Sequence, residues 1–375
     1  MKKKLMLITV ILLIGLLALG CGSSGDAAKD NAQDKTAADN AANNEGEKES
    51  AEPTKKIEAK FVSEEIEGDF MTVWAEKFAD DMRESSDDNL DITVYPYGTL
   101  GDTRDINELA QLGVVEYVFS DFAWISSFVP EAQVLALHYM WPKDNAPEVL
   151  EWVVKNGEFM DVLEKNFRKN GLVPLSVMFE GWQWISSNEP IRNLEDMNGF
   201  KARIMGSKLL VEDYQAYGMV PTPMSYGEVY SGLQMGLIEG QINPLFAIKS
   251  MNFYEVQESL TQIYAEPFLG IPTVNMQFFD SLPKEKQEEM RKWWSDAIIP
   301  AADWIEERNS SDLEKMLEDK PELEVIKLDD AEVAKFKEKA ETVYPKFLEL
   351  GGDGAEEILN VLQKDIEDAK AALGI

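Results

Sequence analysis

The sequence predicts an α/β protein that is long enough for two domains and ends in a mostly helical segment. Strand-like and helix-like stretches alternate from residue 57 to about residue 280. The chain from 57 to 375 is long enough for two domains with separate cores. Residues 283–320 keep apolar side chains at helical spacing. Alternating strands and helices imply parallel strands joined by right-handed crossovers.

The first part of the chain is interpreted as two helices between three strands. After Asp69, a suitable N-cap, apolar residues recur every three or four positions. Residues 90–95 alternate between apolar and polar side chains, which indicates a strand. The expected elements are a strand at 59–62, a helix from 69 to about 82, a strand at 90–95, a helix that starts at 102 or 103 and ends at Gly113, and a buried strand at 114–119.

The second part repeats this alternation and then turns helical. Ser225 and Glu228 fit a capping box at the start of a helix that Gly236 ends. As one helix, 283–320 would be about 55 Å long, and Pro300 should kink it. The other expected elements are strands at 172–179, 182–186, 200–204, 237–242 and 273–279, and a helix at 207–217.

The first twenty residues have the layout of a secretory signal. Residues 2–4 are lysines, and the apolar run at 5–19 is short for a spanning helix. Residues 18–21, Ala-Leu-Gly-Cys, are similar to a bacterial lipobox, in which the cysteine is lipidated. We expect a signal peptide at 1–20 and a lipid anchor on Cys21, the only cysteine. The alternative is an uncleaved N-terminal anchor with an incidental thiol.

Residues 21–56 are mostly Ala, Asn, Asp, Glu, Lys, Gly and Ser. Such a stretch buries too little apolar surface to offset the entropy of ordering it. We expect a disordered tether with a root-mean-square span of about 30–35 Å. The folded part then lies outside the cytoplasm, held to the outer face of a membrane.

The formal net charge of −33 limits the partners. It argues against nucleic acid and against anionic lipid surfaces, since both are bound by lysine and arginine. To bind an anion, such an acidic protein would need a specific cationic side chain in a shielded pocket.

Catalytic motifs are absent from the sequence. The single histidine, His138, lies in the apolar segment 135–140, and no cysteine outside the anchor could act with it. The aspartate pairs at 80–81 and 87–88 are interpreted as solvated faces rather than hydrolytic carboxylates. The chain has no glycine-rich nucleotide loop and no His/Cys zinc set. We therefore expect binding without catalysis, cofactor or metal; a metal that bridges ligand and protein stays an open alternative.

Three stretches carry a resemblance to a known family. They are YPYGTLGDTRDINELAQLG at 95–113, NLEDMNGFKARIMGS at 193–207 and PTPMSYGEVYSGLQMGLIEGQINPLFAIKSMNFYEVQ at 221–257. In this order and spacing the chain resembles the solute-binding component of TRAP (tripartite ATP-independent periplasmic) transporters, of the dicarboxylate-binding type. The resemblance covers roughly residues 58–345.

This resemblance implies a periplasmic-binding-protein-like, or Venus-flytrap, fold. Two α/β domains would flank a cleft, a long helix would span both, and a hinge motion would close the cleft on the ligand. The implied domain I is 57–180 with 269–308, and domain II is 181–268 with 309–375. The implied partners are a small organic acid and the membrane permease subunits.

The resemblance also implies a carboxylate site. Members usually hold the ligand carboxylate with the arginine of a Lys-x-Arg stretch, which here is Arg203, and its planar fork of N–H donors matches a carboxylate. Asn243 matches a position that helps hold the same carboxylate, and Tyr226 matches a pocket wall. The alternatives are an ion-paired strand-end arginine, a turn asparagine before proline and a core tyrosine.

Gln183 departs from the family pattern, because many relatives carry a second arginine there. The loss of that cation weakens the case for a dicarboxylate or a sialic-acid-like ligand. Aromatic residues surround the expected cleft, and Trp182, Trp184, Trp124 and Phe70 are candidates for its wall. We therefore expect a monocarboxylate with an apolar or aromatic body.

Other functions stay open. One is a binding protein of the same fold for a C4-dicarboxylate, a sugar acid, another anion or a zwitterion. Another, from a different class, is a surface lipoprotein that acts as sensor input or adhesin. An extracytoplasmic hydrolase would need catalytic residues that the sequence does not display.

Overall fold

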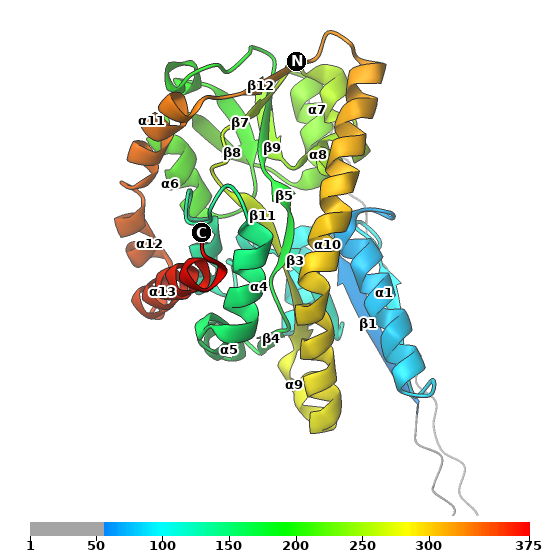
Figure 1. Cartoon of the computed structure of the whole chain (residues 1–375). Coiled ribbons are helices and arrows are strands. Elements are labelled where there is room, and N and C mark those ends of the chain that lie inside the picture. Colours follow the sequence, from blue (N-terminus) through cyan, green and yellow to red (C-terminus); the bar gives the residue numbers. More distant parts are fainter. Residues whose placement is uncertain (1–55) are drawn as a thin grey trace, which may run out of the picture. The chain divides into compact units, whose positions relative to one another are not determined.

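Two six-stranded sheets organise residues 56–375, the part of the chain that the computed structural model describes (Figure 1). The predicted signal peptide, Cys21 and all but the last residue of the predicted tether lie outside the described residues. Each sheet carries helices, and we call each sheet with its helices a lobe. The predicted α/β class with two domains is confirmed.

The first sheet has the strand order β2-β1-β3-β11-β4, with β5 paired to β11. Strand β1 is parallel to β2 and β3, as the predicted β-α-β pattern requires, whereas β11 is antiparallel to its neighbours. The strands are β1 (Ile57–Ser63), β2 (Leu90–Tyr95), β3 (Tyr117–Asp121), β4 (Leu172–Pro174), β5 (Met178–Trp182) and β11 (Pro267–Asn275).

The second sheet has the strand order β12-β10-β6-β9-β7-β8. Strand β7 is parallel to β8 and β9, so this lobe repeats the β-α-β arrangement. The strands are β6 (Trp184–Ser187), β7 (Lys201–Ile204), β8 (Val220–Pro223), β9 (Gly240–Asn243), β10 (Ser259–Gln262) and β12 (Glu324–Lys327).

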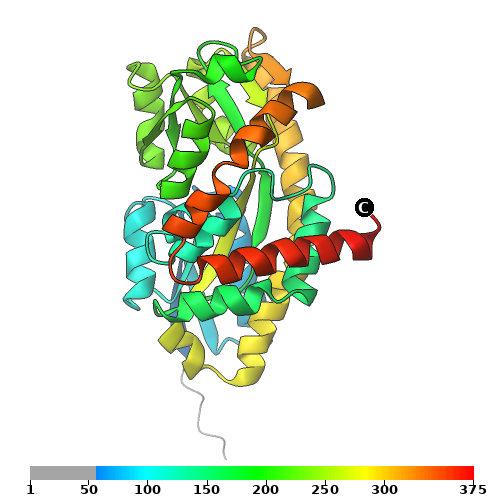
Figure 2. The same ribbon diagram turned by 90° about the vertical axis from the view of Figure 1, so that its left-hand side faces the viewer.

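The helices cover the faces of both sheets and part of the edge between them (Figures 1 and 2). None of the helices within 56–375 has the length and apolar character needed to cross a membrane. The α-helices are α1 (Phe70–Ser85), α2 (Thr103–Gln111), α3 (Phe122–Ile125), α4 (Ala146–Asn156), α5 (Phe159–Arg168), α6 (Lys208–Ala216), α7 (Val229–Gln234), α8 (Leu245–Ser250), α9 (Met276–Ser281), α10 (Lys284–Asp319), α11 (Asp330–Ala340), α12 (Tyr344–Leu350) and α13 (Ala355–Leu373). Short 3-10 helices lie at η1 (Pro130–Ala136), η2 (Leu194–Met197), η3 (Tyr226–Glu228) and η4 (Phe253–Val256).

Three links between the lobes precede the return of the chain to the first lobe at its C-terminal end. Gln183 alone separates β5 from β6, and residues 263–266 join β10 to β11. The third link is α10, which packs against α1 and α4 of the first lobe and α8 of the second (Figure 1). This confirms the predicted long helix at 283–320, and Pro300 lies inside it. We call these two short segments and this helix the hinge.

Helix α13 returns to the first lobe. Its residues Ile358, Leu362, Ile366 and Ala369 repeat at intervals of three or four and are buried against α4 and α5 (Figure 2). The sequence had placed all of 309–375 with the second domain. The C-terminal helix differs from that expectation, because first-lobe helices cover its apolar stripe. The rest of the domain division stays a prediction.

Several elements begin or end at other residues than predicted. The expected capping box at Ser225 does not form: a 3-10 turn begins there, and the Ser225 hydroxyl lies 3.3 Å from Asp102 Oδ2 of the first lobe. The strand expected at 273–279 ends at Asn275, whose side chain caps α9 by accepting from the N–H groups of Gln277 and Phe278. The strand expected at 172–179 is split into β4 and β5.

Candidate ligand-binding site between the two lobes

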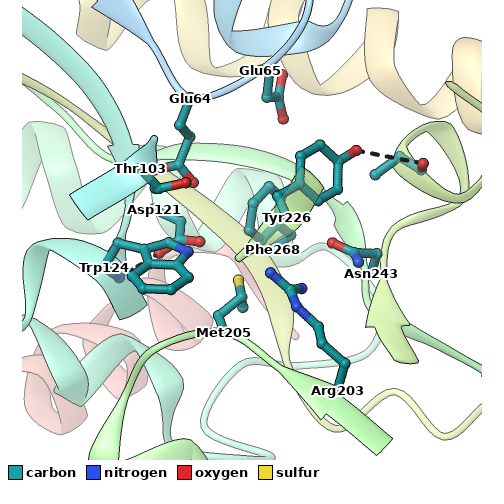
Figure 3. Close-up of a pocket in the computed structure, with 11 residues that line it drawn as sticks. Glu64, Glu65, Thr103, Asp121, Trp124, Arg203, Met205, Tyr226, Asn243 and Phe268 are labelled. Carbon is teal, nitrogen blue, oxygen red and sulfur yellow. Dashed lines mark hydrogen bonds between the residues drawn. The ribbon is translucent and has the colours of Figure 1, made fainter. Parts of the chain in front are cut away.

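A pocket lies between the lobes, beside the crossover strands (Figure 3). The first lobe contributes acidic side chains, and the second lobe contributes an arginine, an asparagine and a tyrosine. The lining residues are Glu64, Glu65, Thr103, Asp121, Trp124, Arg203, Met205, Tyr226, Asn243, Ala247 and Phe268.

The strand ends explain why these side chains meet. Glu64 directly follows β1, and Asp121 ends the parallel strand β3. In the second lobe Arg203 lies in β7, and Asn243 ends the parallel strand β9. The carboxyl ends of parallel strands converge at one edge of a sheet, where α/β proteins generally bind ligands. Two such edges face each other across the pocket.

Arg203 is the cation of the pocket. It is 1% exposed, and its Nε donates to the carbonyl of Met224 at 3.0 Å. Its Nη1 has no hydrogen-bond partner among residues 56–375. Burial lowers the pKa of Arg203 to about 10, and the nearby charge of Asp121 opposes that shift. The guanidinium therefore stays charged at neutral pH and has a donor group available for an anion.

Three carboxyl groups line the first-lobe side of the same pocket, each with one oxygen already engaged. Glu64 accepts from the Ser120 hydroxyl at 2.5 Å, and Glu65 accepts from the N–H of Met71 at 2.6 Å. Asp121 caps α3 by accepting from the backbone N–H groups of Ala123 and Trp124 at 2.7 and 2.8 Å. The carboxyl groups of Glu64 and Asp121 lie close enough to share a proton, and a cation or a hydrogen-bond donor that enters the pocket can take the place of that proton.

Burial dominates the electrostatics of these acids. It raises the pKa of Glu65 to about 8 and that of Asp121 to about 6, and it raises the pKa of Glu64 well above its usual range. Glu180 lies behind them, fully buried, with no hydrogen-bond partner for either carboxyl oxygen within 56–375. Burial, and next the charge of Glu65, raises the pKa of Glu180 as well. A cation that enters the pocket would lower the pKa values of these acids and stabilise their charged forms.

The pocket is nearly closed. The free volume between its side chains is about 20 Å³, which is room for roughly one water molecule. Hydrogen bonds join the lobes at its rim: Gly227 N–H donates to the hydroxyl of Tyr97 at 3.2 Å, and the Ser250 hydroxyl donates to Asp69 at 2.7 Å. The lobes must therefore separate before a small molecule can enter.

The structure brings four of the eight predicted binding residues into the pocket. Arg203, Asn243, Tyr226 and Trp124 line it together. Asn243 also hydrogen-bonds through its amide nitrogen to Gln241. The site assignment itself stays a prediction for these four.

The other four predicted residues lie elsewhere. Phe70 is fully buried against Trp74, Phe119 and Trp304, so it belongs to the core of the first lobe. Trp182 packs against Phe179 and Tyr264 near the hinge. Trp184 is buried opposite Asn243 in the β6–β9 pair and does not line the pocket. Gln183 is buried at the crossover, and neither polar atom of its side chain has a partner within residues 56–375.

Sequence reasoning missed the acidic wall. Glu64 and Glu65 come directly after β1, and Asp121 ends β3; the predicted strands stopped one or two residues earlier. The rule that ligands bind at the carboxyl ends of parallel strands would have marked all three. Phe268 was missed because no pattern separates a buried strand residue from a pocket residue. His138, interpreted as a packed side chain, is fully buried, and its Nδ1 lies 2.7 Å from the Tyr217 hydroxyl.

Within 56–375, no group of three or more His, Cys, Asp or Glu side chains is arranged to hold a metal ion.

The buried acids predict an unusual pH dependence of stability for the ligand-free protein. Burial raises the pKa of Glu65 to about 8, of Asp213 to about 7 and of Asp69 to about 6. The folded state therefore keeps protons that the unfolded state loses near pH 4, and stability falls as the pH rises from 4 to 8. The melting temperature should drop by roughly 1.5 °C for each kcal/mol lost in a chain of this size. Calorimetric melting at pH 5, 6.5 and 8 tests this, and a melting temperature that rises over the range would contradict it.

Comparison with known proteins places the chain in a family. Residues 61–350 match the DctP family, described as bacterial extracellular solute-binding protein, family 7. The ectoine-binding periplasmic protein TeaA of Halomonas elongata is 33% identical over 308 residues, which cover 82% of this chain and 89% of that protein. The ectoine/5-hydroxyectoine-binding periplasmic protein UehA of Ruegeria pomeroyi is 33% identical over 307 residues, which cover 82% of this chain and 90% of that protein.

Solved structures agree with this assignment. The structure of the Halomonas elongata ectoine-binding protein has a TM-score of 0.78 and covers 83% of this chain and 99% of its own. A TRAP periplasmic solute-binding protein from Desulfovibrio salexigens with bound orotic acid has a TM-score of 0.78, is 25% identical and covers 84% of this chain and 100% of its own. The family match and the shared two-domain fold lead to one conclusion: the chain belongs to the DctP family of extracytoplasmic solute-binding proteins, which bind small organic ligands for TRAP transporters.

Proposed function

We propose that this protein captures a small zwitterion that carries one carboxylate and one cationic group, with ectoine as the leading candidate. One observation carries the proposal: the buried guanidinium of Arg203 and the carboxyl groups of Glu64, Glu65 and Asp121 line the same pocket. A pocket with both signs of charge matches a ligand with both signs of charge. Two relatives that are 33% identical to this chain are named for binding ectoine, whose ring is a protonated amidine that bears a carboxylate.

In this proposal each wall of the pocket has a separate role. Arg203 and Asn243 hold the ligand carboxylate, and the acidic wall holds the cationic group. The rings of Trp124, Tyr226 and Phe268 cover the apolar part of the ligand. The expected preference for a single carboxylate is kept, because a second carboxylate would face the acidic wall. The ligand proposed here has a compact cationic ring in place of the apolar or aromatic body expected from the sequence.

The wider role follows from the family. Closed on its ligand, the protein delivers it to the TRAP membrane permease and performs no catalysis itself. A lipid on Cys21 would keep it at the outer face of the membrane. Labelling of cells with an alkyne fatty acid tests the anchor: we expect the label on the wild-type chain and its loss in Cys21→Ala.

A ligand panel tests the proposal. Ligand at a hundred times its Kd stabilises the folded state by about 2.7 kcal/mol, or roughly 4 °C in melting temperature for a chain of this size. We expect that shift with ectoine and none with succinate, galacturonate or orotate at the same concentration. A shift with succinate or galacturonate alone would favour the dicarboxylate or sugar-acid alternative. No shift with any small molecule would favour a sensor or an adhesin.

A side chain at Gly206 is expected to hinder closure of the two lobes and so weaken ligand binding. It follows β7 of the second lobe, and a Cβ placed on it would lie 2.6 Å from Cε3 of Trp124 of the first lobe. Gly206→Ala should therefore hold the lobes apart at a cost of about 1–3 kcal/mol, which is roughly 5-fold to 150-fold in ligand affinity. Separation of the lobes relieves the overlap, so the melting temperature without ligand should change little. Calorimetry measures both quantities, and an unchanged affinity would show that Gly206 and Trp124 do not meet in the bound state.

A further inference from the structure

A second pocket, separate from the one that Arg203 lines, is bounded in part by the segment that joins β10 to β11. It is bounded by the loop at 139–143, by Tyr264 between β10 and β11, by one face of α11 and by Lys370 of α13. Its free volume is about 210 Å³, against the roughly 10–15 Å³ that one water molecule needs. The pocket can therefore hold a molecule of several atoms together with water.

The charge of this pocket is opposite to that of the protein. Lys143, Lys337 and Lys370 line it against a single acid, Asp330, in a chain with a net charge of −33. Lys370 pairs with Glu367. Within residues 56–375, neither of the other two ammonium groups forms an ion pair, and most lysines of this part do.

Aromatic rings position the two unpaired lysines. The Nζ of Lys143 lies 4.4 Å from the ring centre of Tyr264, and that of Lys337 lies 5.5 Å from the ring centre of Tyr139. The third ring is Trp141, which is 4% exposed, and its indole N–H is buried without an acceptor among the described residues. Three lysines against one aspartate give this pocket more hydrogen-bond donors than acceptors among its charged side chains.

The two tyrosines sit in strained backbone. Tyr139 has a φ of 59° and Tyr264 a φ of 51°, which bulky residues rarely adopt. Hydrogen bonds tie the strained segments together: Tyr139 N–H donates to Ala265 O at 2.6 Å, and its hydroxyl donates to Ile263 O at 3.2 Å. Such strain persists where the surroundings enforce it and is common at binding sites.

We propose that this hinge-side pocket is a second ligand site, which binds a small oxyanion such as sulfate, phosphate or a carboxylate. The ammonium groups of Lys143 and Lys337 neutralise the anion and donate hydrogen bonds to it. Helix α11 packs on α6 of the second lobe, and α13 packs on α4 of the first. A bound anion therefore joins both lobes at the hinge, and its occupancy is linked to opening of the cleft.

Equilibrium dialysis with radiolabelled sulfate tests the site on the full chain. Arg203→Ala serves as the background, because the cleft guanidinium could itself hold sulfate; chloride keeps the ionic strength constant. We expect saturable binding of about one sulfate per chain. Lys143→Gln with Lys337→Gln should weaken it at least tenfold.

A charge-matched control separates a site from general attraction. Lys208→Gln with Lys327→Gln removes the same charge from two exposed positions outside the pocket and should leave sulfate binding unchanged. Non-saturable binding, or equal losses in both double variants, would overturn the proposal. Because the test uses a chain without the cleft arginine, its result is independent of the cleft ligand.

Discussion

Replacement of Arg203 by alanine is expected to abolish ligand binding while the protein stays folded. The guanidinium is 1% exposed and has an unpaired Nη1 in the pocket. Truncation of one partner of a buried charge pair costs about 2–5 kcal/mol, which corresponds to roughly 30-fold to several-thousand-fold weaker binding. The side chain lies at the cleft between the lobes rather than in either core, so the fold does not depend on it. Isothermal titration calorimetry measures the affinity, and thermal melting measures the fold.

Two further variants sharpen that experiment. Arg203→Lys keeps the charge but loses the planar fork, so we expect an intermediate affinity. Arg104→Ala is the matched control, because Arg104 is exposed on α2 and does not line the pocket. An affinity of Arg203→Ala equal to that of the wild type would show that the carboxylate is held elsewhere.

Glu65→Gln is expected to remove the preference for a zwitterion. The amide keeps the size of the side chain and can still accept from the N–H of Met71, which donates to Glu65 at 2.6 Å. It cannot ionise when the cationic group of the ligand enters, whereas Glu65 can. The variant should therefore bind ectoine at least about a hundredfold more weakly than the wild type, since a buried charge pair is lost. A carboxylate of the same size without a positive charge should lose little or nothing.

Glu65 is a better choice than its neighbours for this test. Asp121 caps α3 with two hydrogen bonds, so its replacement would also disturb the fold. Glu67→Gln is the matched control, because Glu67 is exposed and two residues away. Equal losses for the zwitterion and the plain carboxylate in Glu65→Gln would contradict a role in charge recognition.

Much of the fold could be predicted because the sequence patterns agree with the tertiary packing. The alternation at 90–95 and the helical spacing after Asp69 describe faces that are buried in the structure. The long apolar stripe of 283–320 could be read in the same way. Prediction failed where a distant contact decides the outcome, as at Ser225, whose hydroxyl interacts with Asp102 from the other lobe.

The same limit applies to the site. Arg203 and Asn243 were found from the resemblance, and the structure brings them together. Phe70 looked like a wall residue because periodicity gives the face of a helix but not what lies against it; it packs among rings of α1, β3 and α10. The acidic wall joins residues more than fifty positions apart, and no local pattern shows that they share a pocket with an arginine.

The central claim is that the pocket recognises both charges of its ligand. The most direct measurement is isothermal titration calorimetry of the wild-type protein with ectoine, with a ring carboxylate of the same size that lacks the cation, and with a cyclic amidine that lacks the carboxylate. We expect ectoine to bind at least a hundredfold more tightly than either partial ligand. Equal or tighter binding of the plain carboxylate would contradict the claim and return the site to simple carboxylate recognition by Arg203.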